Sequence, residues 1–182
     1  MSMTWHHAVN DFWFAELTPQ DWFGGGSALD AKIKAAFEPL YDKVRQNPPE
    51  PADMDAHEHL AAVILFDQFP RNMFRGTAQA FATDTLAQAF AGDAVDHGLD
   101  RALDGAQRQF LYMPFMHAED RDMQVRSRAL FTALGQKEPL DFAYQHKGVI
   151  DRFGRFPQRN AALGRTSTPE EQKFLATTTY KW

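Results

Sequence analysis

The stretch Leu60-Ala-Ala-Val-Ile-Leu-Phe-Asp-Gln-Phe-Pro-Arg-Asn-Met-Phe-Arg75 is the most informative segment of the chain. Its first seven residues are all apolar, and such a run predicts a central helix that is buried on most sides. We expect this helix to begin at Asp53 or Asp55, because acidic residues favour a helix N-terminus. We expect it to end at Phe69, because the following Pro70 disfavours helical geometry in the residue before it.

A shorter copy of this stretch lies near the end of the chain, in Val149-Ile-Asp-Arg-Phe-Gly-Arg-Phe-Pro-Gln-Arg-Asn160. Both segments contain Phe-x-x-Phe-Pro, and in both an arginine and an asparagine follow. We call residues 66–75 the first corner and residues 153–160 the second corner. We expect the two corners to meet and a functional site to lie where they do.

Length and composition indicate an ordinary globular protein. The 182 residues are 44% hydrophobic and 24% charged, and we expect one domain over residues 1–182. The absence of cysteine excludes disulfides, thiolate metal sites and cysteine nucleophiles. The N-terminus has no basic segment followed by an apolar core, and the longest apolar run is far shorter than the roughly 20 residues of a membrane span. A cytoplasmic protein without membrane contact is expected.

Charge is unevenly distributed along the chain. The overall net charge is −5, with an excess of acidic residues before residue 60 and a cluster of arginines between residues 146 and 165. Nucleic-acid-binding proteins usually present a broad basic face, whereas this basic segment is short. A small anion or the carboxylate of a partner therefore fits the segment better than nucleic acid does.

The remaining sequence predicts only helices. No stretch alternates apolar and polar residues over the length of a strand, so we expect an all-α fold. Short connections favour antiparallel packing of neighbouring helices, and consecutive helical pairs suggest a helical-repeat-like stack of seven to nine helices, although no regular period near 34 residues is present. Pro39 should kink or split one helix, Pro114 should interrupt another, and Val125 should face the core. Further helices are predicted at residues 5–17, from 27 past 44, from 83 or 84 to about 97, from 104 to 114, at 118–134 and 138–153, and from 167 or 168 over 174.

The first group of candidate site residues lies on the first corner and comprises Asp67, Arg71, Asn72 and Arg75. Arginine suits the two-point recognition of a carboxylate or phosphate. An alternative reading is structural: Asp67 would pair with Arg71 or Arg75 and stabilise the turn, while Asn72 bonds the local backbone. Both readings stay open at this stage.

The second group belongs to the second corner and the residues on either side of it: Arg152, Arg155, Arg159, Asn160 and Arg165. Four arginines so close in sequence repel one another unless acidic groups or a bound anion lie between them. Either distant carboxylates such as Glu119 and Asp120 pair with them, or the cluster is open to a ligand. The sequence does not decide between these alternatives.

The third group concerns acid–base chemistry. His117 stands with Glu119 and Asp120 between two predicted helices, and His146 precedes the second corner. Either histidine could act as a general base that a carboxylate positions. The simpler reading is that the two carboxylates favour a helix N-terminus. No metal site is expected, because His57 and His59 are two residues apart and point in different directions on a helix.

Three ordered motifs resemble one family: Asp67-Gln-Phe-Pro-Arg-Asn-Met-Phe-Arg-Gly-Thr77, Phe110-Leu-Tyr-Met-Pro-Phe-Met-His-Ala-Glu-Asp120, and Arg152–Asn160 with Leu163–Glu171. It is the bacterial domain-of-unknown-function family 924, and the resemblance extends from about Val9 to Leu175. It implies an all-helical, tetratricopeptide-repeat-like fold and no assigned activity. Where this chain has Gln158, the family usually shows a histidine. Any acid–base role of a histidine there would be missing from this protein.

These observations favour an uncharacterised helical protein that binds an anionic small molecule or a peptide carboxylate between the two corners. One alternative is a hydrolase or transferase that uses a histidine–carboxylate pair on an anionic substrate. Another is a structural scaffold for a partner protein. No cofactor is expected, because the sequence contains no phosphate-binding loop and no dinucleotide-binding fingerprint.

Overall fold

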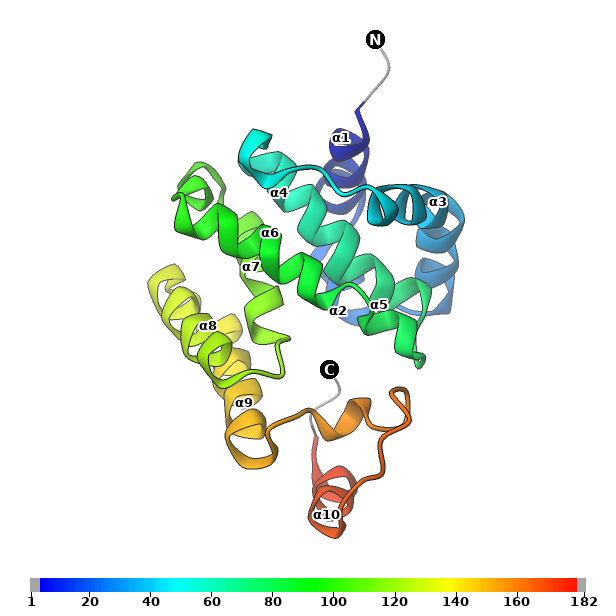
Figure 1. The fold of residues 1–182 in the computed structure, drawn as a ribbon, viewed down its shortest axis with the longest axis vertical. Helices are drawn as coiled ribbons and strands as arrows, with labels where there is room; N and C mark the ends of the chain where they lie inside the picture. Colours follow the sequence, from blue (N-terminus) through cyan, green and yellow to red (C-terminus); the bar gives the residue numbers. More distant parts are fainter. Residues whose placement is uncertain (1–3, 180–182) are drawn as a thin grey trace.

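The computed structural model describes residues 4–179 of the chain, and within this range all regular structure is helical (Figure 1). The predicted all-α class is confirmed. Counted as continuous helices, the described residues form nine, at the upper end of the predicted range. The tetratricopeptide-like arrangement stays a prediction. Residues 1–3, which belong to the N-terminal stretch where no signal peptide is expected, lie outside the described residues.

Two of the nine helices contain π-helical segments. In chain order the elements are α1 (Trp5–Asn10, continued by a π-helical segment at Asp11–Glu16), α2 (Pro19–Gly24), α3 (Ser27–Gln46), α4 (Ala56–Val63, continued by a π-helical segment at Ile64–Gln68 and by α5 at Phe69–Met73), α6 (Asp84–Asp96), α7 (Gly105–Met116), α8 (Arg121–Leu134), α9 (Lys137–Phe153) and α10 (Pro169–Thr177). Short 3-10 turns lie at Pro51–Asp53, Ala78–Phe81, Leu99–Ala102 and Pro157–Arg159.

The helix formed by α4, its π-helical segment and α5 is the centre of the fold. Asp55 caps its start, accepting hydrogen bonds from the backbone N–H groups of His57 and Glu58. Every residue from Leu60 to Phe66 is fully buried, which confirms the prediction of a central buried helix. The predicted end at Phe69 is wrong, because the helix continues through Pro70 to Met73.

A hydrogen bond from outside the helix explains how it passes Pro70. Proline has no N–H to donate to the carbonyl oxygen four residues earlier, which here belongs to Phe66. The hydroxyl group of Thr83 donates to that oxygen at 2.7 Å. The π-helical segment just before Pro70 contains Asp67, and such segments occur frequently at functional sites.

Other expectations based on proline and on periodicity also need correction. Pro39 does not split α3, and Pro114 does not interrupt α7, which continues to Met116. Helix α8 begins three residues later than predicted. Val125 on that helix is 48% exposed instead of facing the core. The buried position belongs to Gln124, whose amide nitrogen donates to the carbonyl oxygens of Met116, the last residue of α7, and of Ala118.

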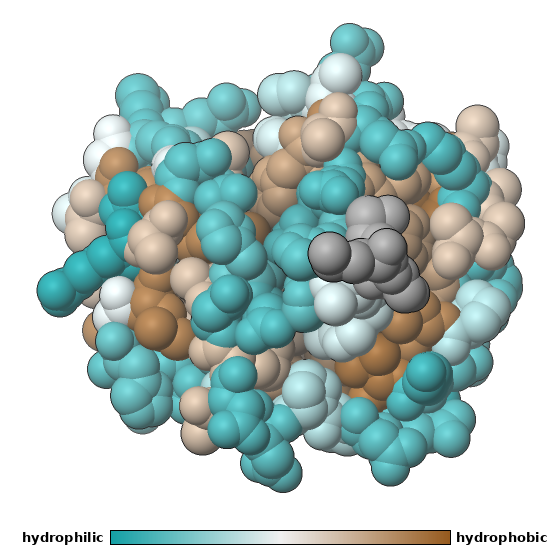
Figure 2. Space-filling view, turned by 90° about the horizontal axis from the view of Figure 1, so that it is seen from above, coloured by the Kyte–Doolittle hydropathy of each residue, from teal (hydrophilic) through white to brown (hydrophobic). Residues whose placement is uncertain are grey.

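The C-terminal part of the chain packs as a small unit beside the larger helical body. Figure 1 shows α10 and the irregular segment before it at one end of the molecule, next to the α8–α9 pair. A separate small core of Val149, Ile150 and Phe156 holds this part together. The face in Figure 2 is mainly hydrophilic, with apolar side chains in small patches. No helix within residues 4–179 has both the length and the apolarity needed to cross a bilayer.

Replacing Thr83 with valine tests how the central helix is stabilised. Thr83→Val keeps the size of the side chain but removes the donor to Phe66, so the free energy of unfolding should fall by about 1 to 2 kcal/mol. Urea unfolding monitored by circular dichroism measures the change. Thr132→Val, which removes an exposed hydroxyl that bonds within its own helix, should cost less than about 0.5 kcal/mol. Equal costs would contradict this explanation.

Candidate functional site

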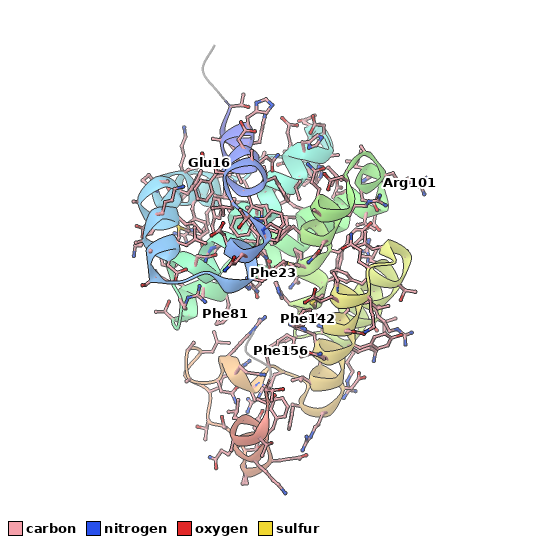
Figure 3. The ribbon with its side chains drawn as sticks, turned by 180° about the vertical axis from the view of Figure 1, so that it is seen from behind. Glu16, Phe23, Phe81, Arg101, Phe142 and Phe156 are labelled. Atoms are coloured by element: carbon pink, nitrogen blue, oxygen red, sulfur yellow. The ribbon has the colours of Figure 1, made fainter. Side chains whose placement is uncertain are left out.

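A cavity of about 560 Å³ lies between the larger helical body and the C-terminal part. Phe23, Phe81, Phe142 and Phe156 belong to its walls and come from four separate segments, as Figure 3 shows. The polar side chains of the lining are Gln68, Arg71, Asn72, Arg75, Gln109, His117, His146, Gln158 and Arg159. The described lining contains no aspartate or glutamate.

The two corners meet at one carboxylate, that of Asp84 at the start of α6. Arg71 of the first corner donates to both oxygens of Asp84, at 2.9 and 3.1 Å. Arg159 of the second corner donates to the same carboxylate at 3.1 Å. The expectation that the corners meet is therefore confirmed, through an acidic residue that was not among the predicted site residues.

Asp67 lies directly behind the cavity wall and is fully buried. Its carboxylate accepts hydrogen bonds from Gln68 and from His117, and Arg71 lies 3.2 Å from it. Burial alone would raise the pKa of Asp67. The charges of Arg71 and His117 and the hydrogen bonds outweigh burial and lower that pKa to about 2. Asp67 is therefore ionised at neutral pH.

His117 follows the last residue of α7, and its ring lines the cavity. Its Nδ1 lies 2.9 Å from both carboxylate oxygens of Asp67. An ionised carboxylate only accepts hydrogen bonds, so Nδ1 carries a proton and donates it to Asp67. Burial is the main cause that lowers the pKa of His117, with Arg71 and Arg159 adding to it and Asp67 opposing it. The ring is therefore neutral at pH 7, and Nε2 holds a lone pair.

The carboxylate that orients His117 is therefore not one of the two neighbours in sequence. Glu119 accepts two hydrogen bonds from Arg165, at 2.6 and 2.9 Å, and one from the backbone of Phe156. Asp120 caps α8 by accepting from the backbone N–H of Met123. The expected pairing of His117 with Glu119 or Asp120 is corrected, because both carboxylates have other partners.

Arg159 differs from the other candidate arginines. Its Nη1 donates to Asp84 and its Nη2 to the carbonyl oxygen of His117, and the guanidinium lies 4.6 and 4.7 Å from the rings of Phe81 and Phe156. Its Nε makes no hydrogen bond to any residue that the structure describes. Burial and the charge of Arg71 lower the pKa of Arg159 to about 10, although Asp84 opposes them.

Most other residues predicted for the site make structural ion pairs or hydrogen bonds. The carboxylates of Asp67 and Asp84 outweigh burial and raise the pKa of Arg71. Hydrogen bonds to Asp30 and Glu171 raise the pKa of Arg75 and Arg155 respectively. The pairs and bonds observed are Asn72 and Arg75 with Asp30, Arg152 with Glu170, Arg155 with Glu171, Arg165 with Glu119, and Asn160 with Ser167, Glu171 and Arg165.

Arg152, Arg155 and Asn160 do not line the cavity, whereas Arg71, Asn72, Arg75 and Arg159 do. The structure thus brings together the first corner and one arginine of the second. The reading in which Asn72 bonds the local backbone is replaced by its bond to the distant Asp30.

His146 also lines the cavity, with its ring centre 6.0 Å from that of His117. Its Nδ1 lies 2.8 Å from the carbonyl oxygen of Phe142 and therefore donates to it. Burial, followed by the charge of His117, lowers the pKa of His146 to about 3. The two candidate histidines thus belong to the same cavity.

Sequence reasoning missed several parts of the site: Asp84, Gln68, the aromatic walls and the buried amide of Gln158. Asp84 was visible only as a residue near a helix start. The amide nitrogen and oxygen of Gln158 are both buried and have no hydrogen-bond partner among the described residues. Within residues 4–179, no group of three or more carboxylate or histidine side chains could hold a metal ion.

Comparisons with known proteins place this chain in a family. The model of the bacterial proteins of unknown function DUF924 matches residues 9–179. The chain belongs to this family. A solved structure of a protein of unknown function from Agrobacterium tumefaciens is 38% identical, with a TM-score of 0.88 over 95% of this chain and 97% of that one. No curated protein matches the chain.

From the two buried histidines we predict how the free energy of unfolding of this DUF924 protein depends on pH. The pKa values of His146 and His117 are lower in the folded protein than in the unfolded chain. Below pH 6.5 the unfolded chain therefore binds more protons at these histidines, and the free energy of unfolding should fall. Between pH 6.5 and 4.5 the loss should be roughly 2 kcal/mol or more. His146→Gln keeps a donor for Phe142 but cannot titrate, so its pH slope should be smaller in urea unfolding series.

His97→Gln is the matched control for this measurement, because the side chain of His97 is 67% exposed. That variant should keep the slope of the wild-type protein. A slope that stays unchanged in His146→Gln would show that folding does not lower the pKa of His146.

Proposed function

We propose that the cavity binds a small molecule that carries an anionic group, either a carboxylate or a phosphate. Arg159, together with Arg71, would contact the anionic group, and the aromatic walls would contact the apolar part of the molecule. A volume of about 560 Å³ lies in the range typical of small-molecule sites. The same size favours a small molecule over a long peptide segment.

The electrostatic environment of Arg159 is the main support for this proposal. Its pKa is lowered, which means that the surrounding carboxylates do not fully compensate its buried charge. Asp84 already makes two hydrogen bonds to Arg71 and shares only one oxygen with Arg159. An anion beside Arg159 would supply the missing compensation, and no described acidic side chain of the lining would repel it.

The unpartnered amide of Gln158 is a second, independent support. A buried polar group without a hydrogen bond costs about 1 to 3 kcal/mol, so folded proteins rarely retain one without a reason. Gln158 borders the cavity and is adjacent in sequence to Arg159. A polar ligand that hydrogen-bonds this amide on binding would recover part of that cost.

Arg159→Met tests the proposal against a matched variant, Arg165→Met. A panel of para-nitrophenyl phosphate, benzoate, succinate and inorganic phosphate is tested by thermal melting. At least one should raise the melting temperature of the wild-type protein. At a hundredfold excess over Kd, binding stabilises the folded state by about 2.7 kcal/mol. Arg159→Met should lose this shift, whereas Arg165→Met should keep it, because Arg165 does not line the cavity.

The two variants should also differ in stability without ligand. Loss of Arg159 leaves Asp84 paired with Arg71, so the cost should be smaller than for Arg165. Loss of Arg165 leaves Glu119 with only a backbone partner, and the cost should be about 2 kcal/mol or more. Two results together would contradict the proposal and favour a structural role for Arg159. Arg159→Met would be as destabilised as Arg165→Met, and no anion would raise the melting temperature of the wild-type protein.

A further inference from the structure

We infer that His117 is a general base that removes a proton from a water molecule in the cavity, so that the bound anionic molecule is a substrate for hydrolysis. This inference rests on the proposed function, because the substrate would be held at the same arginines. It assigns a catalytic role to the pair formed by His117 and Asp67.

The orientation of the ring is the first step of the argument. Asp67 accepts the proton of Nδ1, which fixes the tautomer and leaves the lone pair on Nε2. Nε2 has no hydrogen bond to any described residue, and the side chain is 15% exposed, on the lining of the cavity. A carboxylate, a histidine and a vacant imidazole nitrogen in this order form the base of many hydrolytic sites.

The backbone around His117 is also held in place, as a precise base requires. Gln124 donates to the carbonyl oxygens of Met116 and Ala118, on either side of the histidine. Arg159 donates to the carbonyl oxygen of His117 itself at 2.8 Å. The ring and the peptide that carries it are thus fixed by separate hydrogen bonds.

The composition of the lining decides what the base acts on. Within the described residues the cavity wall contains no serine, threonine, tyrosine or lysine, and the chain contains no cysteine. Apart from the two histidines, the described wall therefore holds none of the side chains that usually attack a substrate covalently. Water is then the nucleophile that a histidine base would activate.

The step balances without any further reagent. One O–H bond of the water breaks, its proton moves to Nε2 of His117, and the oxygen bonds to the electrophilic carbon or phosphorus of the substrate. The bond to the leaving group breaks with its electron pair, and the leaving group receives the proton from Nε2. Asp67 stabilises the transient imidazolium, and Arg159 stabilises negative charge that develops on the substrate.

The charged and titratable groups around His117 come from three parts of the fold: Asp67 and Arg71 from the central helix, His146 from α9, and Arg159 from the second corner. Asp67 favours the imidazolium, whereas Arg71 and Arg159 disfavour it. A bound anion would offset the two arginines, so that the base strength of His117 would rise when substrate is present.

Two chromogenic probes test the inference: para-nitrophenyl phosphate and mono-para-nitrophenyl succinate. Release of para-nitrophenol and thermal melting are measured on the same protein samples. The wild-type protein should hydrolyse one of the probes, and the choice of probe distinguishes phosphate esters from carboxylic esters. His117→Gln should lower kcat by about 10²- to 10⁴-fold while keeping the melting shift.

Further variants separate catalysis from folding. Asp67→Asn should also lower kcat, because an amide can donate to Nδ1 and so place the proton on Nε2. Arg159→Met should lose the melting shift and the activity together. His97→Gln, at a histidine outside the cavity lining, should leave both unchanged. The pH–rate profile of the wild-type protein should rise through one inflection below pH 7, which His117→Gln should lack.

The outcomes distinguish the inference from the proposed function. A melting shift without hydrolysis of either probe would overturn the role of His117 as a general base and leave the proposed ligand binding intact. A melting shift with equal hydrolysis by the wild-type protein and by His117→Gln would have the same meaning. No melting shift and no hydrolysis would overturn both. The nitrogen NMR spectrum of the wild-type protein gives a test that needs no substrate: His117 should be protonated on Nδ1 at pH 7, and a proton on Nε2 would overturn the inference.

Discussion

The ionised carboxylate of Asp67, buried without access to water, is the constraint on which this structure depends. A buried charge is tolerated only when other charges and hydrogen bonds surround it, and removing one partner of such a pair is costly. Its partners come from the same helix, through Gln68 and Arg71, and from the far end of α7, through His117. The central helix and α7 are thereby held in one arrangement, and the cavity wall acquires its histidine.

The same network extends to the C-terminal part, which has a small core of its own. That core contains three buried apolar residues, Val149, Ile150 and Phe156. Ion pairs add further contacts with the larger body. Arg159 binds Asp84, and Arg165 binds Glu119. Of these four residues only Arg159 lines the cavity, where we propose that a ligand binds.

Features that depend on local sequence could be predicted, and features that depend on distant partners could not. The burial of Leu60–Phe66 follows from an apolar run, and the cap at Asp55 follows from an acid before a helix. The end of the helix was misplaced because the donor that compensates for Pro70 is Thr83, on a separate segment. His117 and Asp67 are 50 residues apart, so proximity in sequence suggested Glu119 and Asp120 instead.

The arginines show why composition alone could not separate structure from function. A cluster of guanidinium groups repels itself whether carboxylates or a ligand finally compensate it, so the sequence allowed both solutions. The fold uses carboxylates for Arg75, Arg155 and Arg165. At Arg159 compensation is incomplete, and this arginine also holds the peptide that presents His117. A ligand that neutralised Arg159 would therefore act on the electrostatic environment of the histidine directly, which couples binding to the protonation of the base without any movement of the helices.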